Sequence, residues 1–222
     1  MVDAGSTDAT VQIARTAGAT VIERDWTNFL DARRFAVAEV HTPWTFMLDA
    51  DERIDDRLRH AIIELEPPVE VYGYAVRRVT RFCGVPITAL GWNEQLLRMF
   101  RTQRGILRAH PVAGGNAALH ERWEVNGCVG ELSGVLIHES YPDRASYRRK
   151  FSRYTTLEAE GVAASPASLV WTAAIALPRF LWLLGPRGGC RAGWRGAYLA
   201  FWSAVYPVVV HAKALLRART RG

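Results

Sequence analysis

The chain has 222 residues, of which 49% are hydrophobic, so intrinsic disorder is excluded and one domain with an appendage can bury a sizeable core. The net charge of +6 conceals an asymmetry: residues 1–140 carry −4, whereas residues 141–222 carry 13 Lys and Arg against 3 Asp and Glu, a balance of +10. The three cysteines form no CxxC pair, which argues against a disulfide framework and a structural zinc site and is typical of a reducing compartment.

The first part of the chain predicts strands alternating with helices. The opening letters, MVDAGSTDAT, are typical of a buried strand that ends in a tight turn and runs into a helix. Such alternation predicts a mostly parallel α/β sheet, in which ligands bind at the carboxyl ends of the strands. The acidic turns around Asp3 and Asp49 would then open on the same edge of one sheet. The predicted elements are a helix over 8–17, a strand over 19–22, a helix over 28–40, a strand over 44–48 and a helix over 55–65.

After Pro67-Pro68 the pattern changes to shorter, alternating strands. We interpret this part as an antiparallel extension with long loops, of the kind that shapes a substrate pocket. A helix follows it. The predicted strands are 71–81, 96–100, 129–132 and 135–138, and the helix covers 144–161.

The last part is apolar and basic. Residues 167–184 have about the length that spans a bilayer, but Pro178 and Arg179 interrupt the run, and the second run, 197–210, contains Pro207. Both runs are rich in Trp and Tyr and are flanked by arginines, which favours a membrane interface. We therefore predict a monotopic or re-entrant helical pair rather than a true span. The alternative is a helical subdomain that packs on the sheet or forms a dimer.

Asp49-Ala-Asp51 places two carboxylates at the end of a buried strand. Hard oxygen ligands of this kind suit Mg²⁺ or Mn²⁺, which complete their coordination with phosphate oxygens and water. The alternative is that Asp49 caps the following helix and that Asp51 and Glu52 only favour its N-terminal dipole. The second acidic turn upstream favours the ligand-binding interpretation.

The motifs around the two acidic turns resemble those of a known family. VDAGSTDAT is similar to the VDSGSTDGT segment of family 2 glycosyltransferases, and FMLDADER is similar to their LDADE metal motif. Later segments, RFCGVPITALGWNEQLLRMFR, the LHE of 119–121 and GVLIHESYPDRASYRRKFSRYTTLEAE, resemble the bacterial lipopolysaccharide core β-glycosyltransferases of the lipooligosaccharide glucosyltransferase type. The resemblance covers roughly residues 2–160.

The resemblance implies a GT-A fold, a Rossmann-like α/β domain over residues 1–140 that here would lack its first strand, followed by a membrane-associated helical region over 141–222. It also implies a nucleotide-sugar donor, a UDP-sugar foremost, and a divalent cation, Mg²⁺ or Mn²⁺. Carried onto this sequence, Asp3 would contact the base or ribose, Asp49 would lie near the ribose and donor sugar, and Asp51 would hold the metal. Arg98 would reach the diphosphate if its strand keeps alternating.

An inverting transferase also needs a general base for the acceptor hydroxyl. Glu121, which matches the HE motif of the family, is the first candidate and Glu94 the second; either could instead be a surface or salt-bridged glutamate. His138 is interpreted as a structural histidine.

We therefore expect an inverting glycosyltransferase that acts on a lipid-linked glycan, peripheral or monotopic on the cytoplasmic face of the inner membrane, with no nucleic-acid partner. The alternative is an inactive, truncated fragment that only binds membrane or a partner, because the strand with a TKNE-like segment found in the family is missing from this sequence.

Overall fold

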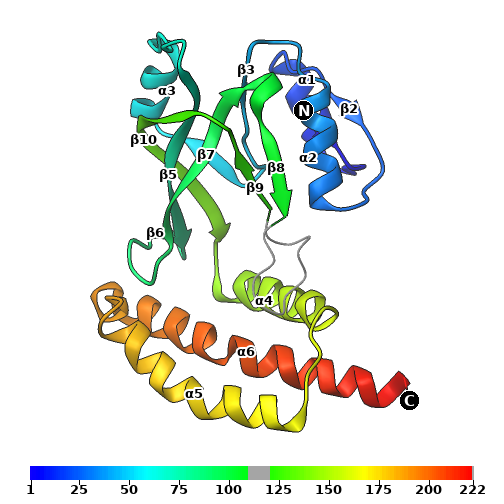
Figure 1. Ribbon diagram of the computed structural model, residues 1–222, viewed down its shortest axis with the longest axis vertical. Helices are drawn as coiled ribbons and strands as arrows, with labels where there is room; N and C mark the ends of the chain where they lie inside the picture. The colour runs from blue at the N-terminus through cyan, green and yellow to red at the C-terminus, as the bar shows by residue number, and fades with distance from the viewer. Residues whose placement is uncertain (110–120, 222) are drawn as a thin grey trace.

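The computed structural model describes residues 1–109 and 121–221. A sheet-containing part lies above a stack of three helices (Figure 1). Two short strands and two helices form the start of the chain. The elements are β1 (Val2–Asp3), α1 (Thr10–Thr16), β2 (Ile22–Glu23) and α2 (Phe29–Ala38).

The main sheet is six-stranded and mixed. Its strand order is β3-β7-β5-β10-β4, with β6 paired to β5. Only β5 and β10 run parallel in this sheet; the other neighbours are antiparallel. The strands are β3 (Trp44–Phe46), β4 (Glu52–Ile54), β5 (Val71–Phe82), β6 (Val85–Pro86), β7 (Asn93–Arg101) and β10 (Cys128–Tyr141).

The expectation of one mostly parallel sheet is therefore corrected. In the described residues, β1 and β2 form a parallel pair of their own, and no hydrogen-bonded strand joins them to the main sheet. Strand β7 returns from β5 as its antiparallel neighbour and separates β5 from β3. The turn after β1 and the turn after β3 consequently follow strands of two different sheets.

The segments 129–132 and 135–138 are parts of one strand, β10. Its pairing with β5 shifts between Glu131 and Val135, and Gly134 in this bulge has φ +101°. A Cβ at Gly134 would collide with the backbone of Leu58. The bulge therefore lets α3 (Asp56–Ile63) pack closely on the sheet.

The capping residue of α3 is Asp55. Its side chain accepts hydrogen bonds from the backbone N–H of Leu58 at 2.8 Å and of Val135 at 3.0 Å. Asp49 does not cap this helix, which leaves its carboxylate for other partners. A small third sheet pairs β8 (Ile106–Ala109) with β9 (Glu121–Glu124).

The last three helices are layered on one another. Helix α4 (Arg144–Ala159) lies nearest the sheet, α6 (Gly193–Arg221) lies next, and α5 (Pro166–Leu184) lies farthest from it (Figure 1). Ser165 and Ser168 form a capping box at the start of α5. Pro178 and Pro207 lie within α5 and α6 and do not end them. By length and composition, α5 and the stretch 189–220 could each cross a membrane.

A shared core joins the helices to the sheet. Phe82 at the end of β5 and Ile87 in the following loop pack with Tyr147 of α4, Leu183 of α5 and Leu199 of α6. All five side chains are buried. The basic, apolar half of the chain is therefore anchored on the end of the main sheet.

Candidate active site

Asp49 follows β3 and lies between two guanidinium groups. Its two carboxylate oxygens accept from Arg33 of α2 at 2.7 Å and from Arg98 of β7 at 3.0 Å. Burial raises the pKa of the Asp49 carboxyl, but the charges of Arg98 and Arg33 outweigh it and hold this pKa below its usual range. Asp49 is therefore an anion held in a fixed position.

Glu52 holds the acidic turn in place through its buried carboxylate. Its side chain is fully buried and forms a short ion pair with Arg98, and Arg78 lies 3.7 Å away. Its second oxygen accepts from the backbone N–H of Asp49 at 3.0 Å. Arg98, which is itself buried, is thus engaged by the two acids of the turn rather than pointing to open solvent.

Asp51 points to a different group of residues. One oxygen lies 3.2 Å from Nε2 of His138 on β10 and 3.2 Å from Nζ of Lys150 on α4. Lys150 also donates to the Ser140 hydroxyl at 3.1 Å. The hydrogen bond from His138 is the largest cause that holds the pKa of Asp51 far below its usual value, and the charge of Lys150 adds to it against the opposing effect of burial.

A cleft of about 180 Å³ lies beside this group. Because His138 both lines the cleft and contacts Asp51, the acidic turn lies next to the cleft. Glu94 also lines it and pairs with Arg78 at 2.8 Å. The lining residues are Arg78, Thr80, Gly91, Trp92, Glu94, His138 and Tyr141.

Glu121 begins β9, and its side chain is nearly inaccessible. Its Oε1 pairs with Arg33 at 2.8 Å, so Arg33 bridges Glu121 and Asp49. Its Oε2 is buried without a hydrogen-bond partner in the part of the chain that is described. Leu119 and His120, the other members of the predicted LHE motif, lie outside the described residues.

The side chain of Asp3 forms its hydrogen bonds within the turn that follows β1. Its carboxylate accepts from the backbone N–H groups of Gly5 at 2.9 Å and Ser6 at 2.8 Å and from the Ser6 hydroxyl at 2.6 Å. The Ser6 hydroxyl is the largest cause of the lowered pKa of Asp3. Within 1–109 and 121–221 no ion pair or hydrogen bond connects Asp3 with Asp49 or Asp51.

No group of three or more His, Cys, Asp or Glu side chains that could hold a metal ion is present in the described part of the chain. Asp51 and His138 offer one oxygen and one nitrogen donor, which is fewer than a structural metal site requires. The carboxylate of this pair is a hard oxygen ligand, and a Mg²⁺-type ion held by one carboxylate takes its other ligands from phosphates and water.

From the sequence, Arg33 fits either a solvated helix face or a family position that lines the donor cleft, His138 is interpreted as structural, and Arg78 and Lys150 are not assigned to the site. Lys150 is one of only two lysines and lies 99 positions from Asp51. Its rarity is a weak signal, because Arg supplies the other cations. The pairing itself has no local sequence pattern.

The molecule is an α/β protein with a mixed sheet, an acidic strand-end turn surrounded by cations, and an adjoining cleft. The chain belongs to glycosyl transferase family 2, whose family model matches residues 1–122. It is 29% identical over 229 residues to the lipopolysaccharide core biosynthesis glycosyltransferase LpsC of Rhizobium meliloti (strain 1021), covering 98% of this chain and 82% of that protein.

Shorter matches agree with this family. An uncharacterized glycosyltransferase of Rickettsia prowazekii (strain Madrid E) is 39% identical over 62 residues, which are 28% of this chain and 21% of that protein. One of Rickettsia felis is 33% identical over 102 residues, 45% of this chain and 33% of that protein. The family relationship predicted from VDAGSTDAT and FMLDADER is thereby confirmed.

Proposed function

We propose that this chain is an inverting glycosyltransferase that moves a sugar from a nucleotide-sugar donor, a UDP-sugar foremost, to a lipid-linked glycan such as a lipopolysaccharide core. The observation that carries the proposal is the contact of Asp51 with His138, a lining residue of the cleft, in a chain of this family. The near full-length similarity to LpsC supports the class of acceptor. The reaction would take place on the cytoplasmic face of the inner membrane.

The donor diphosphate would lie against Asp51. Lys150 supplies a cation there, and its contact with Ser140 keeps its ammonium group beside the acidic turn. Asp49, held by Arg33 and Arg98, would orient the ribose and donor sugar. Arg98 itself acts in this proposal as a positioning residue for Asp49. Asp3 would contact the base or ribose once its carboxylate exchanges a hydrogen bond within its turn for one to the nucleotide.

A Mg²⁺ or Mn²⁺ ion would be held by the Asp51 carboxylate. When bound, such an ion neutralises charge that develops on the diphosphate leaving group. The Asp51 carboxylate is ionised at neutral pH and can bind a cation. Lys150, which already contacts the same oxygen, would turn to the diphosphate.

Two glutamates compete for the role of general base. A base must reach the acceptor hydroxyl within hydrogen-bond distance. Glu94 lines the cleft and its side chain is 37% exposed, whereas that of Glu121 is 5% exposed. The match to the family motif favours Glu121, and the geometry of the cleft favours Glu94. Whichever of Glu94→Gln and Glu121→Gln lowers turnover by about 10²–10⁴-fold while donor binding is kept identifies the base.

The central test is Asp51→Ala in the purified full-length chain. We expect metal-dependent transfer from a panel of nucleotide-sugars to be abolished, as measured by mass spectrometry of the glycan product. Asp56→Ala, which removes an exposed carboxylate from the first turn of α3, is the matched control and should retain turnover. Unchanged turnover of Asp51→Ala would contradict the mechanism. Absence of donor binding in calorimetry would favour the non-catalytic alternative.

A further inference from the structure

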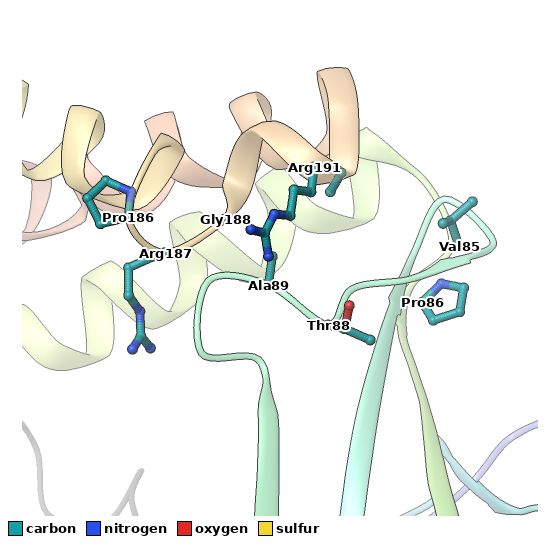
Figure 2. A pocket seen from close by; sticks show the side chains of 9 residues that line it. Val85, Pro86, Thr88, Ala89, Pro186, Arg187, Gly188 and Arg191 are labelled. Atoms are coloured by element: carbon teal, nitrogen blue, oxygen red, sulfur yellow. The ribbon is translucent and has the colours of Figure 1, made fainter.

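We propose that a hollow at the connection between α5 and α6 binds the phosphate of an anionic membrane lipid while the outer face of α5 lies in the bilayer interface. The hollow has a volume of about 310 Å³. It lies between the connection after α5 and the loop after β6 (Figure 2). The proposal rests on the membrane location proposed above but not on sugar transfer.

The chemistry of the hollow is that of an anion site. Arg187 and Arg191 both line the hollow; the Arg191 side chain reaches towards Ala89, whereas the Arg187 side chain extends past the loop in another direction (Figure 2). Both side chains are exposed, and in the part of the chain that the structure describes neither forms an ion pair with a carboxylate. Two guanidinium groups that border one hollow without a carboxylate partner give it a positive charge, which suits a phosphate.

The walls of the hollow are fixed by the core beneath it. The backbone N–H of Leu90 donates to the carbonyl of Arg187 at 3.0 Å, which ties the loop to the helical connection. Ile87 and Leu90 are buried against Leu183 and Leu199. Because both walls are held before any ligand arrives, binding there would order little additional backbone.

The outer face of α5 indicates that the occupant belongs to a membrane. A stripe of exposed apolar side chains runs along this helix at helical spacing, while Thr172 and Leu183 are buried on its other side. Helix α5 itself is the layer farthest from the sheet, on the other side of α6 (Figure 1). Its residues are Val170, Trp171, Ala174, Leu177, Leu181 and Trp182.

The stripe and the hollow meet at Trp182. The guanidinium of Arg187 lies over the Trp182 ring, 5.2 Å from its centroid. A helix that buries its apolar face about 5–10 Å into the boundary of the acyl chains keeps its flanking cations at the level of the head groups. Trp182 would therefore lie in the interface with Arg187 and Arg191 beside the lipid phosphates. The balance of +10 over residues 141–222 complements an anionic leaflet.

This site would also set the distance of the cleft from the membrane. One loop lines both the hollow and the cleft: Ala89 lines the hollow, and Gly91 lines the cleft together with His138. The Arg187 guanidinium packs directly against Gly91. A lipid phosphate at Arg187 would thus place the cleft next to the surface from which a lipid-linked acceptor extends.

The test is flotation of the full-length chain with vesicles of phosphatidylcholine, with and without phosphatidylglycerol, in the absence of any donor. The variant is Arg187→Gln/Arg191→Gln, and the matched control is Arg57→Gln/Arg59→Gln, which removes two exposed arginines from α3. At about 1 kcal/mol for each cation near the surface, we expect the first pair to lower partitioning to anionic vesicles about 30-fold. The α3 pair should lower it much less.

Equal losses in the two pairs would overturn the proposal, as would a full-length chain that does not float with anionic vesicles. Arg187→Lys/Arg191→Lys keeps the charge, and its partitioning to anionic vesicles should stay within about threefold of that of the unmodified chain. A loss of partitioning as large as that of the Gln pair would contradict the proposal.

Calorimetry with inorganic phosphate separates the two sources of phosphate. If the Gln pair abolishes that binding but leaves vesicle binding unchanged, the site takes a soluble phosphate and the lipid assignment is wrong. Because no donor is present, a chain that transfers no sugar can still support the proposal.

Discussion

The buried pair of Arg98 and Glu52 determines the shape of the acidic turn. Glu52 is inaccessible and Arg98 nearly so, which means that both charges have been removed from water. Such a pair contributes little net stability, but removing one partner leaves the other charge buried without full compensation. The pair therefore fixes where Asp49 lies rather than adding much to the free energy of unfolding.

Replacing Arg98 with Met should lower the free energy of unfolding by about 3–5 kcal/mol, because Glu52 would lose its nearest cation and keep the more distant Arg78 and the backbone N–H of Asp49. Urea denaturation measures this. Arg77→Met is the control, since Arg77 is exposed on the neighbouring strand. The double variant Arg98→Met/Glu52→Leu should recover most of the loss. A loss for Arg98→Met no larger than that for Arg77→Met would contradict the interpretation.

The environment of Asp51 predicts a specific dependence of stability on pH. Its pKa in the folded chain lies below the ordinary value of 3.8, chiefly because His138 donates to it. Its contribution to stability is therefore present above pH 3.8 and is lost as the pH falls towards the lower folded-state pKa. The difference in free energy of unfolding between the unmodified chain and Asp51→Asn should therefore shrink as the pH falls below 3.8.

This difference is measured by urea denaturation at a series of pH values. Carboxylates common to both chains cancel in the comparison. In a His138→Ala background the same Asp51→Asn comparison should show a smaller dependence on pH, because the largest cause of the shift has been removed. An equal dependence in both backgrounds would show that His138 is not the main partner of Asp51.

Residue patterns single out the acids of the candidate site but not most of the cations around them. Asp49 and Asp51 stand out because both lie in one short motif, and their roles stay predictions. Their partners come from elsewhere: Arg33 is 16 positions before Asp49 and Lys150 is 99 positions after Asp51. Contacts of this kind depend on how α2 and α4 pack, which no local spacing encodes.

At the scale of elements, helices were predictable and strand pairing was not. The periodicity of α2, α4 and α5 is a local property, and the predicted ranges lie within a few residues of the observed ones. The position of β7 between β3 and β5 depends on long-range hydrogen bonds. Strand β4 was missed because Glu52-Arg53-Ile54 is polar and looks like the approach to a helix.

The bulge of β10 is the element feature most sensitive to substitution. Gly134→Ala should lower the free energy of unfolding by more than about 2 kcal/mol, because the left-handed φ and the collision with Leu58 act together. Gly18→Ala is a matched control, with φ +83° but nothing within 4 Å of a Cβ, and should cost only about 1–2 kcal/mol. Thermal and urea unfolding measure both. Equal losses would show that α3 moves away to accept the methyl group.

At the scale of the whole molecule, the shared core makes the helical part and the sheet dependent on each other. Phe82 ends the central strand β5, and its ring stacks on Tyr198 of α6 at a centroid distance of 5.4 Å. Tyr147 of α4 meets the same ring edge-on at 5.8 Å. A sheet whose central strand ends inside the helical core should not unfold separately from it.

Leu199 tests this dependence because it is fully buried where α6 meets the end of β5. Leu199→Ala should lower the free energy of unfolding by about 2–5 kcal/mol through the lost burial and the cavity that remains. Circular dichroism and tryptophan fluorescence should still report one coincident transition. Leu216→Ala is the control, since Leu216 is 62% exposed on the same helix, and should change stability by less than about 0.5 kcal/mol. Two separate unfolding transitions, of which Leu199→Ala shifts only one, would contradict this dependence. They would show that the helices fold independently of the sheet and only dock on it.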